Sequence, residues 1–360
     1  MTGLALAGAC PVDVPLAVGP GGVALSAGAI VDLFSSPTEL ASVLVEGLAK
    51  ASLYLMIASG LTLIFGLMDV INFAHGAFTM YGAYLAGTVV LTLGVGSFGL
   101  VGSVATFALI LVGVFLLLAL FGVVFEVGLV RRLYDYPPIF MILLTFGVSI
   151  TMEEFMRMLV DYFEVNSARE AVDWSIPRQE TVPEELQGSF DVAGVSVGGL
   201  HPLQILLGVL TVVGIWYFLN RTRYGLFVRA GVEDDEMAKA LGINIKRTFT
   251  VVFAVGSGLA GAAGVMLMWS PLWQVNVPLA LGVLLPAFVI VIVGGLGSFK
   301  GTVVASLLVG MLDAFATWAF RVEVVTFTDI DQLLIFAILV VMLVLQPRGL
   351  FGVEGQGDHG

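Results

Sequence analysis

The sequence predicts an all-α fold: a polytopic transmembrane helical bundle of about nine spans (eight to ten), with a broken helix near residues 66–82. Of its 360 residues, 59% are hydrophobic and only 12% are charged, and the mean hydropathy is +1.04. A soluble domain usually carries roughly 25% charged residues. Apolar runs of about 20 residues, each long enough to cross a bilayer core, recur along almost the whole chain.

Breaks at glycine, proline and clustered charges divide the chain into nine expected helices. They cover residues 41–67, 73–93, 100–126, 138–160, 201–220, 248–270, 277–294, 302–320 and 330–346. Residues 1–40 are expected to be an N-terminal extension, external or partly membrane-associated, and its apolar stretch VGPGGVALSAGAIV leaves room for a tenth segment. The single cysteine, Cys10, excludes a disulfide within the chain, and we expect no metal site and no cofactor.

Lysine and arginine residues indicate the orientation. Basic residues concentrate in cytoplasmic connections, so the side that carries most of them is predicted to be the cytoplasm. Nine alternating helices then leave the N-terminus outside and residues 347–360 as a cytoplasmic tail, with only Arg169, Arg178 and Arg321 on the external side. The cytoplasmic set is Arg131, Arg132, Arg221, Arg223, Arg229, Lys239, Lys246, Arg247, Lys300 and Arg348.

Two hydrophilic stretches interrupt the helices. Residues 161–200, on the external side, hold eight acids and two arginines, a net charge of −6. This stretch is either a solvated loop or a docking surface for an external partner protein.

The second stretch, RTRYGLFVRAGVEDDEMAKALGINIKR at residues 221–247, is predicted to contain a short amphipathic helix on the cytoplasmic side. Consecutive acids at 233–236 lie at its start, where the helix dipole favours anions. Met237, Ala240 and Leu241 share one face at i, i+3 and i+4, and Gly242 ends the helix. Such a helix favours a groove in another protein. The alternative is a helix lying flat on the membrane, against which the acids argue.

Four separated motifs carry a resemblance to a known family. They are LMIASGLTLIFGLMDVINFAHGAFTMYGAY, TRYGLFVRAGVEDDEMAKALGIN, FVIVIVGGLGSFKGT and VLQPRGLFG. In this order and spacing they resemble the permease subunit of branched-chain amino acid ABC transporters, from about residue 40 to residue 352.

The resemblance implies one subunit of a prokaryotic cell-membrane importer. Its implied partners are two cytoplasmic ABC ATPase subunits, a second homologous permease subunit and an extracytoplasmic solute-binding protein, within membrane lipid and without nucleic acid. It also implies that the stretch from Arg229 to Asn244 holds the helix that couples to an ATPase. The expected coupling residues are Arg229, Glu233, Asp234, Glu236, Met237, Ala240, Leu241 and Gly242.

The chain lacks the phosphate-binding motif G-x-x-x-x-G-K-[ST], so we expect no ATPase site and no catalytic residues of its own. The segment GGLGSFKG at residues 294–301 invites a nucleotide-binding interpretation, but no strand precedes it. A tight turn between two spans, with glycines that let helices approach closely, is the other interpretation.

The stretch DVINFAHGAFTMYGAY, residues 69–84, places polar groups in an apolar region. Irregular backbone at membrane depth is tolerated only where protein or water covers it. A helix break before Gly76 would leave unpaired N–H groups that suit a carboxylate. Asn72, His75 and Gly76 are therefore candidate substrate-pathway residues. The alternative is that Asn72 and His75 only satisfy each other and the backbone.

Charged residues inside the expected helices need partners. Glu153 and Glu154 precede Arg157, and Glu46 precedes Lys50, at helical spacing that predicts ion pairs. Asp313 has no cation nearby in the sequence. It either pairs with another helix or lines the substrate pathway, where we place it as a candidate.

Two departures from the family pattern leave the solute open. The family usually has glutamate after the His-Gly pair, where this chain has Ala77, and many relatives have lysine where this chain has Pro286, which is expected to kink its helix. Branched-chain or other hydrophobic amino acids are the first expectation, and urea or short-chain amides are the alternative. A secondary transporter or channel would explain the spans but not the coupling motif.

Overall fold

The computed structural model describes residues 33–68, 72–93, 98–165, 182–183, 186–233, 235–270, 275–322, 330–346 and 348–351. Cys10, most of the N-terminal extension and Asp234 lie outside the described residues. So do the side chains of Glu233 and Glu236, the middle of the 161–200 stretch and most of the tail.

Each of the nine expected spans corresponds to a helix in the described part of the chain, so the all-α polytopic prediction is confirmed. Pro286 lies inside one continuous helix, α11. The helices are α2 (Pro37–Met68), α3 (His75–Leu93), α4 (Gly99–Gly128), α5 (Pro138–Val165), α7 (His201–Arg221), α10 (Ile245–Trp269), α11 (Leu279–Gly294), α12 (Phe299–Arg321) and α13 (Ile330–Leu345).

Among the described residues, six helical stretches are long and apolar enough to cross a membrane, judged by length and composition only. They lie on α2, α4, α5, α7, α10 and α12, whereas α11 and α13 contain shorter apolar stretches. The central helices are α2 and α10, which are mostly buried and pack on each other. Less than a third of the apolar stretch on each of α4, α5 and α7 is buried, and these helices carry many exposed apolar side chains, as expected for helices that face lipid.

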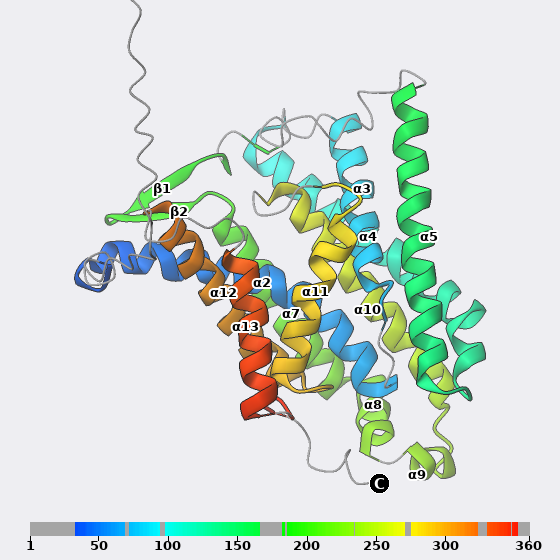
Figure 1. Ribbon diagram of the computed structural model, residues 1–360. Helices are drawn as coiled ribbons and strands as arrows, with labels where there is room; N and C mark the ends of the chain where they lie inside the picture. Colours follow the sequence, from blue (N-terminus) through cyan, green and yellow to red (C-terminus); the bar gives the residue numbers. More distant parts are fainter. Residues whose placement is uncertain are drawn as a thin grey trace, which may run out of the picture.

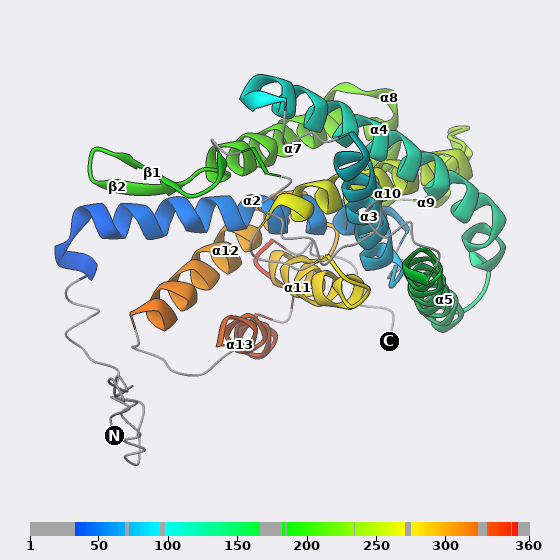
Figure 2. The ribbon, with the colours of Figure 1, turned by 90° about the horizontal axis from the view of Figure 1, so that it is seen from above.

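A β-hairpin lies at one end of the bundle, which we call the hairpin end (Figure 1). Strands β1 (Ser189–Val192) and β2 (Val195–Gly198) pair antiparallel through a two-residue turn with positive φ at Ala193 and Gly194. Figure 2 shows the hairpin running beside the first half of α2, where the Ser196 N–H donates to Ser42 Oγ. The 161–200 stretch was not expected to contain strands.

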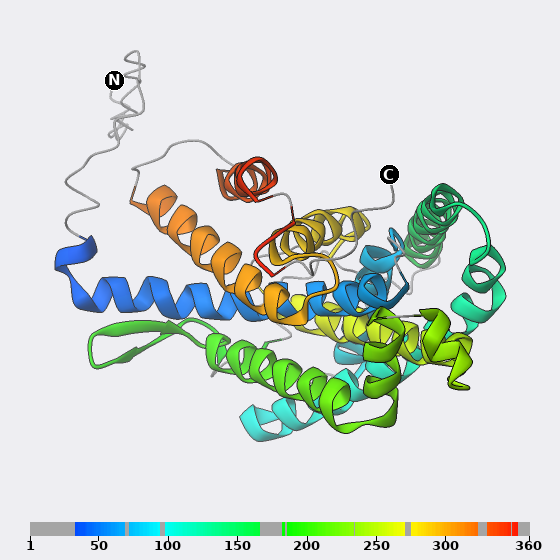
Figure 3. The same ribbon diagram turned by 90° about the horizontal axis from the view of Figure 1, so that it is seen from below.

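Two short helices lie at the opposite end, the α9 end (Figures 1 and 3). The segment 221–247 contains α8 (Arg223–Glu233) and α9 (Asp235–Ala240) instead of the one helix expected. Glu233 therefore ends α8 and does not start α9. The predicted stop at Gly242 is confirmed: it has a φ of +82°, its N–H bonds the Lys239 carbonyl, and the next N–H bonds Ala238, which forms a Schellman motif.

The GGLGSFKG segment forms the tight turn between α11 and α12, also at the α9 end. A Cβ on Gly294 would meet the backbone of Gly301, and one on Gly66 would lie 2.7 Å from the Cα of Gly297. Ser298 Oγ accepts from the Gly301 N–H and caps α12. These glycines let the ends of α2, α11 and α12 touch through backbone.

Candidate functional site

The break between α2 and α3 places two polar residues inside the bundle. Asn72 and His75 are both fully buried. His75 lies beside Ile57, well before Met68, where α2 ends. Helix α3 therefore begins beside the middle of α2 rather than beside its last turn (Figure 1).

Asn72 caps the start of α3. Its side-chain Oδ1 accepts from the Ala74 N–H at 3.1 Å, and its carbonyl accepts from the His75 N–H at 3.2 Å. The Phe73 N–H donates to Thr145 Oγ1 of α5 at 3.2 Å. Three successive N–H groups at a buried helix end are thus satisfied by protein.

Two atoms of this pair have no hydrogen-bond partner. His75 Nε2 lies 2.9 Å from the Ile57 carbonyl, and because a carbonyl can only accept, this nitrogen donates. Nδ1 of the neutral ring is then an acceptor, and it is unpartnered. Asn72 Nδ2, a donor, is also unpartnered. Buried polar atoms without partners are costly and uncommon, so the two atoms mark this position as a candidate site.

Close backbone packing surrounds the pair. A Cβ on Gly60 of α2 would lie 2.5 Å from the Gly256 carbonyl oxygen of α10 and 2.8 Å from His75 Cε1. A Cβ on Gly76 would overlap the Ala280 carbonyl of α11. Helices α2, α3, α10 and α11 therefore enclose the site, with no room for larger residues at these contacts.

Asp313, the other pathway candidate, is held by residues of α2. Lys50 Nζ donates to its Oδ1 at 2.6 Å, and Tyr54 donates to its Oδ2 at 2.7 Å. Lys50 also bonds Thr317 at 2.6 Å and pairs with Glu46 at 3.4 Å, which confirms the predicted Glu46–Lys50 pair. Of the two alternatives for Asp313, pairing with another helix is present, and its place in the pathway stays a prediction.

A predicted ion pair on α5 is also present but exposed. Arg157 lies 3.5 Å from Glu154, and both side chains are more than half exposed. Glu153, by contrast, accepts from Ser149 Oγ at 3.1 Å.

Glu126, which is fully buried near the end of α4, was not predicted from the sequence as a site residue. Arg131, in the short 3₁₀ helix η2 (Val130–Leu133), donates to both its oxygens at 3.0 and 2.9 Å. The same guanidinium donates to Thr250 of α10 at 2.6 Å. Tyr134 donates to Glu126 at 2.6 Å, and burial followed by this bond raises the pKa of its hydroxyl. This network joins the end of α4 to the start of α10.

The expected coupling residues do not gather with Asn72 and His75. Asp234 lies outside the described residues. The others lie on α8, on α9 or directly after α9, and Met237, Ala240 and Leu241 are exposed. Ala238 of α9 is buried. Arg229 of α8 donates to Asn220 at 3.3 Å. The predicted apolar face of α9 is therefore directed outward.

A family model described as the permease component of branched-chain amino acid transport systems matches residues 43–343. This chain belongs to that family. The resemblance drawn from the four motifs is thereby confirmed. Members of this permease family are transport subunits, and the chain is accordingly a multi-pass transport protein of the plasma membrane.

Known permeases align with most of the chain. BraD of Pseudomonas aeruginosa, a high-affinity branched-chain amino acid transport system permease protein, is 29% identical over 86% of this chain and 94% of its own length. LivH of Escherichia coli K12, with the same description, is 24% identical over 85% of this chain and 94% of its own length. A probable permease of this type from Methanocaldococcus jannaschii is 25% identical over 84% of this chain and 90% of its own length. No solved structure matches the chain.

The buried pair Lys50–Asp313 yields a stability prediction. Lys50→Met would leave Asp313 buried without its cation, which costs about 3–5 kcal/mol. The double variant Lys50→Met/Asp313→Leu should recover part of this loss. We expect the thermal unfolding temperature of the purified permease to fall in Lys50→Met and to recover in part in the double variant.

The control is Arg157→Met, which breaks an exposed pair worth about 0–1 kcal/mol. Equal losses of stability in Lys50→Met and Arg157→Met would contradict the prediction.

Proposed function

We propose that this chain is the membrane-spanning permease subunit of an ATP-driven importer of branched-chain or other hydrophobic amino acids. The observation that carries the proposal is the family match over residues 43–343, supported by relatives that align along nearly their whole length. A solute-binding protein outside the cell would deliver the solute. Two ATPase subunits would hydrolyse ATP, and a second homologous permease subunit would complete the pathway.

The proposed orientation places the N-terminus and the hairpin end outside, and the α9 end with the tail in the cytoplasm. The uneven distribution of lysine and arginine supports it. The α9 end also carries the exposed helices that an ATPase would need to reach.

The unpaired atoms of Asn72 and His75 fit the chemistry of an amino acid. An amino acid carries a carboxylate, which accepts hydrogen bonds, and an ammonium group, which donates them. Asn72 Nδ2 is an unpaired donor and His75 Nδ1 an unpaired acceptor. We place both in the pathway, with Gly76 bringing α3 against α11. Asp313 of α12 lies further along the proposed pathway, where it contacts Lys50 and Tyr54 of α2.

Urea or a short-chain amide is the second candidate solute. It is kept because Ala77 replaces the glutamate usual after the His-Gly pair and Pro286 stands where many relatives have lysine. Both are buried in the apolar interior. Uptake by the complete complex in proteoliposomes decides between the solutes.

We expect ATP-dependent accumulation of leucine, isoleucine and valine, with urea excluded. A preference for urea would favour the second candidate, and uptake without ATP would favour a secondary transporter or channel.

Asn72→Ala and His75→Ala should each reduce leucine uptake more than tenfold while the complex still assembles. The loss of a cap or a buried hydrogen bond costs about 1–3 kcal/mol, too little to unfold a large bundle. The matched control is Ser59→Ala, a buried residue of α2 whose hydroxyl is satisfied by the Met56 carbonyl at 3.0 Å. Normal uptake by both alanine variants would mean that the pair only supports the helix break.

The α8–α9 segment with the residues directly after it is the proposed coupling element. Among its large apolar side chains that the structure describes, Leu241 is the most exposed, at 75%. Leu241→Asp should leave the permease folded, because the side chain is largely solvent-accessible. It should remove an apolar anchor from the ATPase contact and reduce copurification of the ATPases about tenfold or more.

Val192→Asp makes the same change at an exposed apolar residue of the hairpin end and is the control. ATPases that copurify with Leu241→Asp at normal yield would refute the coupling assignment.

A further inference from the structure

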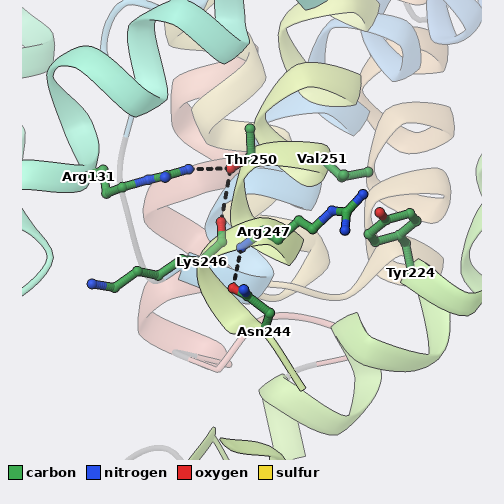
Figure 4. A pocket seen from close by; sticks show the side chains of 7 residues that line it. All are labelled: Arg131, Tyr224, Asn244, Lys246, Arg247, Thr250 and Val251. Carbon is green, nitrogen blue, oxygen red and sulfur yellow. Dashed lines mark hydrogen bonds between the residues drawn. The ribbon is translucent and has the colours of Figure 1, made fainter. Parts of the chain in front are cut away.

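A cavity of about 430 Å³ opens at the α9 end, outside the helix break and the apolar face of α9. Figure 4 shows the residues that line it. Arg131 comes from η2, Tyr224 from α8, and the rest from Asn244 and the first turns of α10. A volume of this size lies within the range of about 300–1,000 Å³ typical of small-ligand sites.

The cavity concentrates positive charge. Arg131 is held in place by its two bonds to Glu126 and its bond to Thr250, and it stays 30% exposed. Lys246 and Arg247 are exposed and form no ion pair with any described residue. In Figure 4, Arg131 and Lys246 lie on one flank of the first turn of α10, while Arg247 extends towards Tyr224 on the other.

The start of α10 adds to this field. Asn244 caps the helix by accepting from the Arg247 N–H at 3.0 Å, so the first turn is well formed. The positive end of the helix dipole therefore adds to the unpaired charges of Lys246 and Arg247, whereas the charge of Arg131 is balanced by Glu126. The chain as a whole has a net charge of −12, so the local excess of positive charge at the cavity is opposite in sign to the net charge of the chain. Arginine, lysine and a helix N-terminus are together the usual partners of phosphate groups.

The position of the cavity indicates where the phosphate comes from. Val251 and Thr250 belong to a helix that qualifies to span the membrane. At the end of α4, Val127 and the C-cap residue Leu129 expose apolar surface just before Arg131. The cavity thus lies where an apolar, lipid-facing surface meets a cluster of cations, which is the level of lipid headgroups.

We infer that this cavity binds the phosphodiester of an anionic phospholipid. Lys246 and Arg247 contact the phosphate, Arg131 completes the cationic wall, and the acyl chains lie along the exposed side of α4. The lipid then bridges η2, α8 and α10. This binding is a property of the single chain, so its test requires no transport partner and stands apart from the proposed function.

The test measures binding of phosphatidylglycerol, phosphatidylcholine and inorganic phosphate to the purified full-length chain in detergent, by native mass spectrometry and equilibrium titration. Lys246→Gln/Arg247→Gln should weaken phosphatidylglycerol binding about tenfold or more, since one or two charge-assisted hydrogen bonds are lost. The matched control, Arg221→Gln/Arg223→Gln, removes two charges at the same end but outside the cavity. It should retain binding.

Each other outcome decides against the lipid site. Inorganic phosphate that binds with the same dependence on Lys246 and Arg247, without lipid binding, would identify free phosphate as the ligand. Phosphatidylcholine bound as tightly as phosphatidylglycerol, or equal losses in the variant and its control, would overturn the inference. So would unchanged phosphatidylglycerol binding in Lys246→Gln/Arg247→Gln.

Discussion

The start of α3 lies inside the bundle, and this buried helix end imposes the strictest condition on the structure. N–H groups there have no water to bond and must find protein partners. Asn72 and Thr145 supply them to three successive residues. The surrounding helices can close over this end because Gly60 and Gly76 offer no side chain at the points of contact. A larger residue at either position would open the site or displace the capping residue.

Helix α2 meets this condition because it is fixed along its length by different kinds of contact. Near the hairpin end it is tied to α12 by the buried pair Lys50–Asp313. In the middle, the Ile57 carbonyl receives the His75 ring. At the α9 end, Gly66 lies against Gly297 through backbone alone. Polar side-chain contacts thus fix α2 where it faces side chains of other helices. Glycine allows contact where backbone must lie directly against backbone.

Much of the helical architecture could be read from the sequence, since long apolar runs bounded by glycine, proline and charges have few other structures available. The hairpin was missed because the 161–200 stretch was judged by its charge, although the alternation in DVAGVSV and the Ala193–Gly194 turn carry a strand signal. The acids at 233–236 were interpreted as the start of one helix. They instead span the boundary between α8 and α9. In this segment only the helix end at Gly242 was predicted correctly.

The polar residues show which contacts could not be predicted from the sequence. Lys50 could be paired with Glu46 at helical spacing, but its stronger contact is Asp313, 263 positions away. Arg131 returns to Glu126 at a spacing of five only because α4 ends between them and the chain turns through η2. Both buried acids are thus matched by cations, so a charge within an apolar span does not by itself mark a solute pathway. Once such pairs are accounted for, the unpaired atoms of Asn72 and His75 are the stronger argument, because these groups still require a partner.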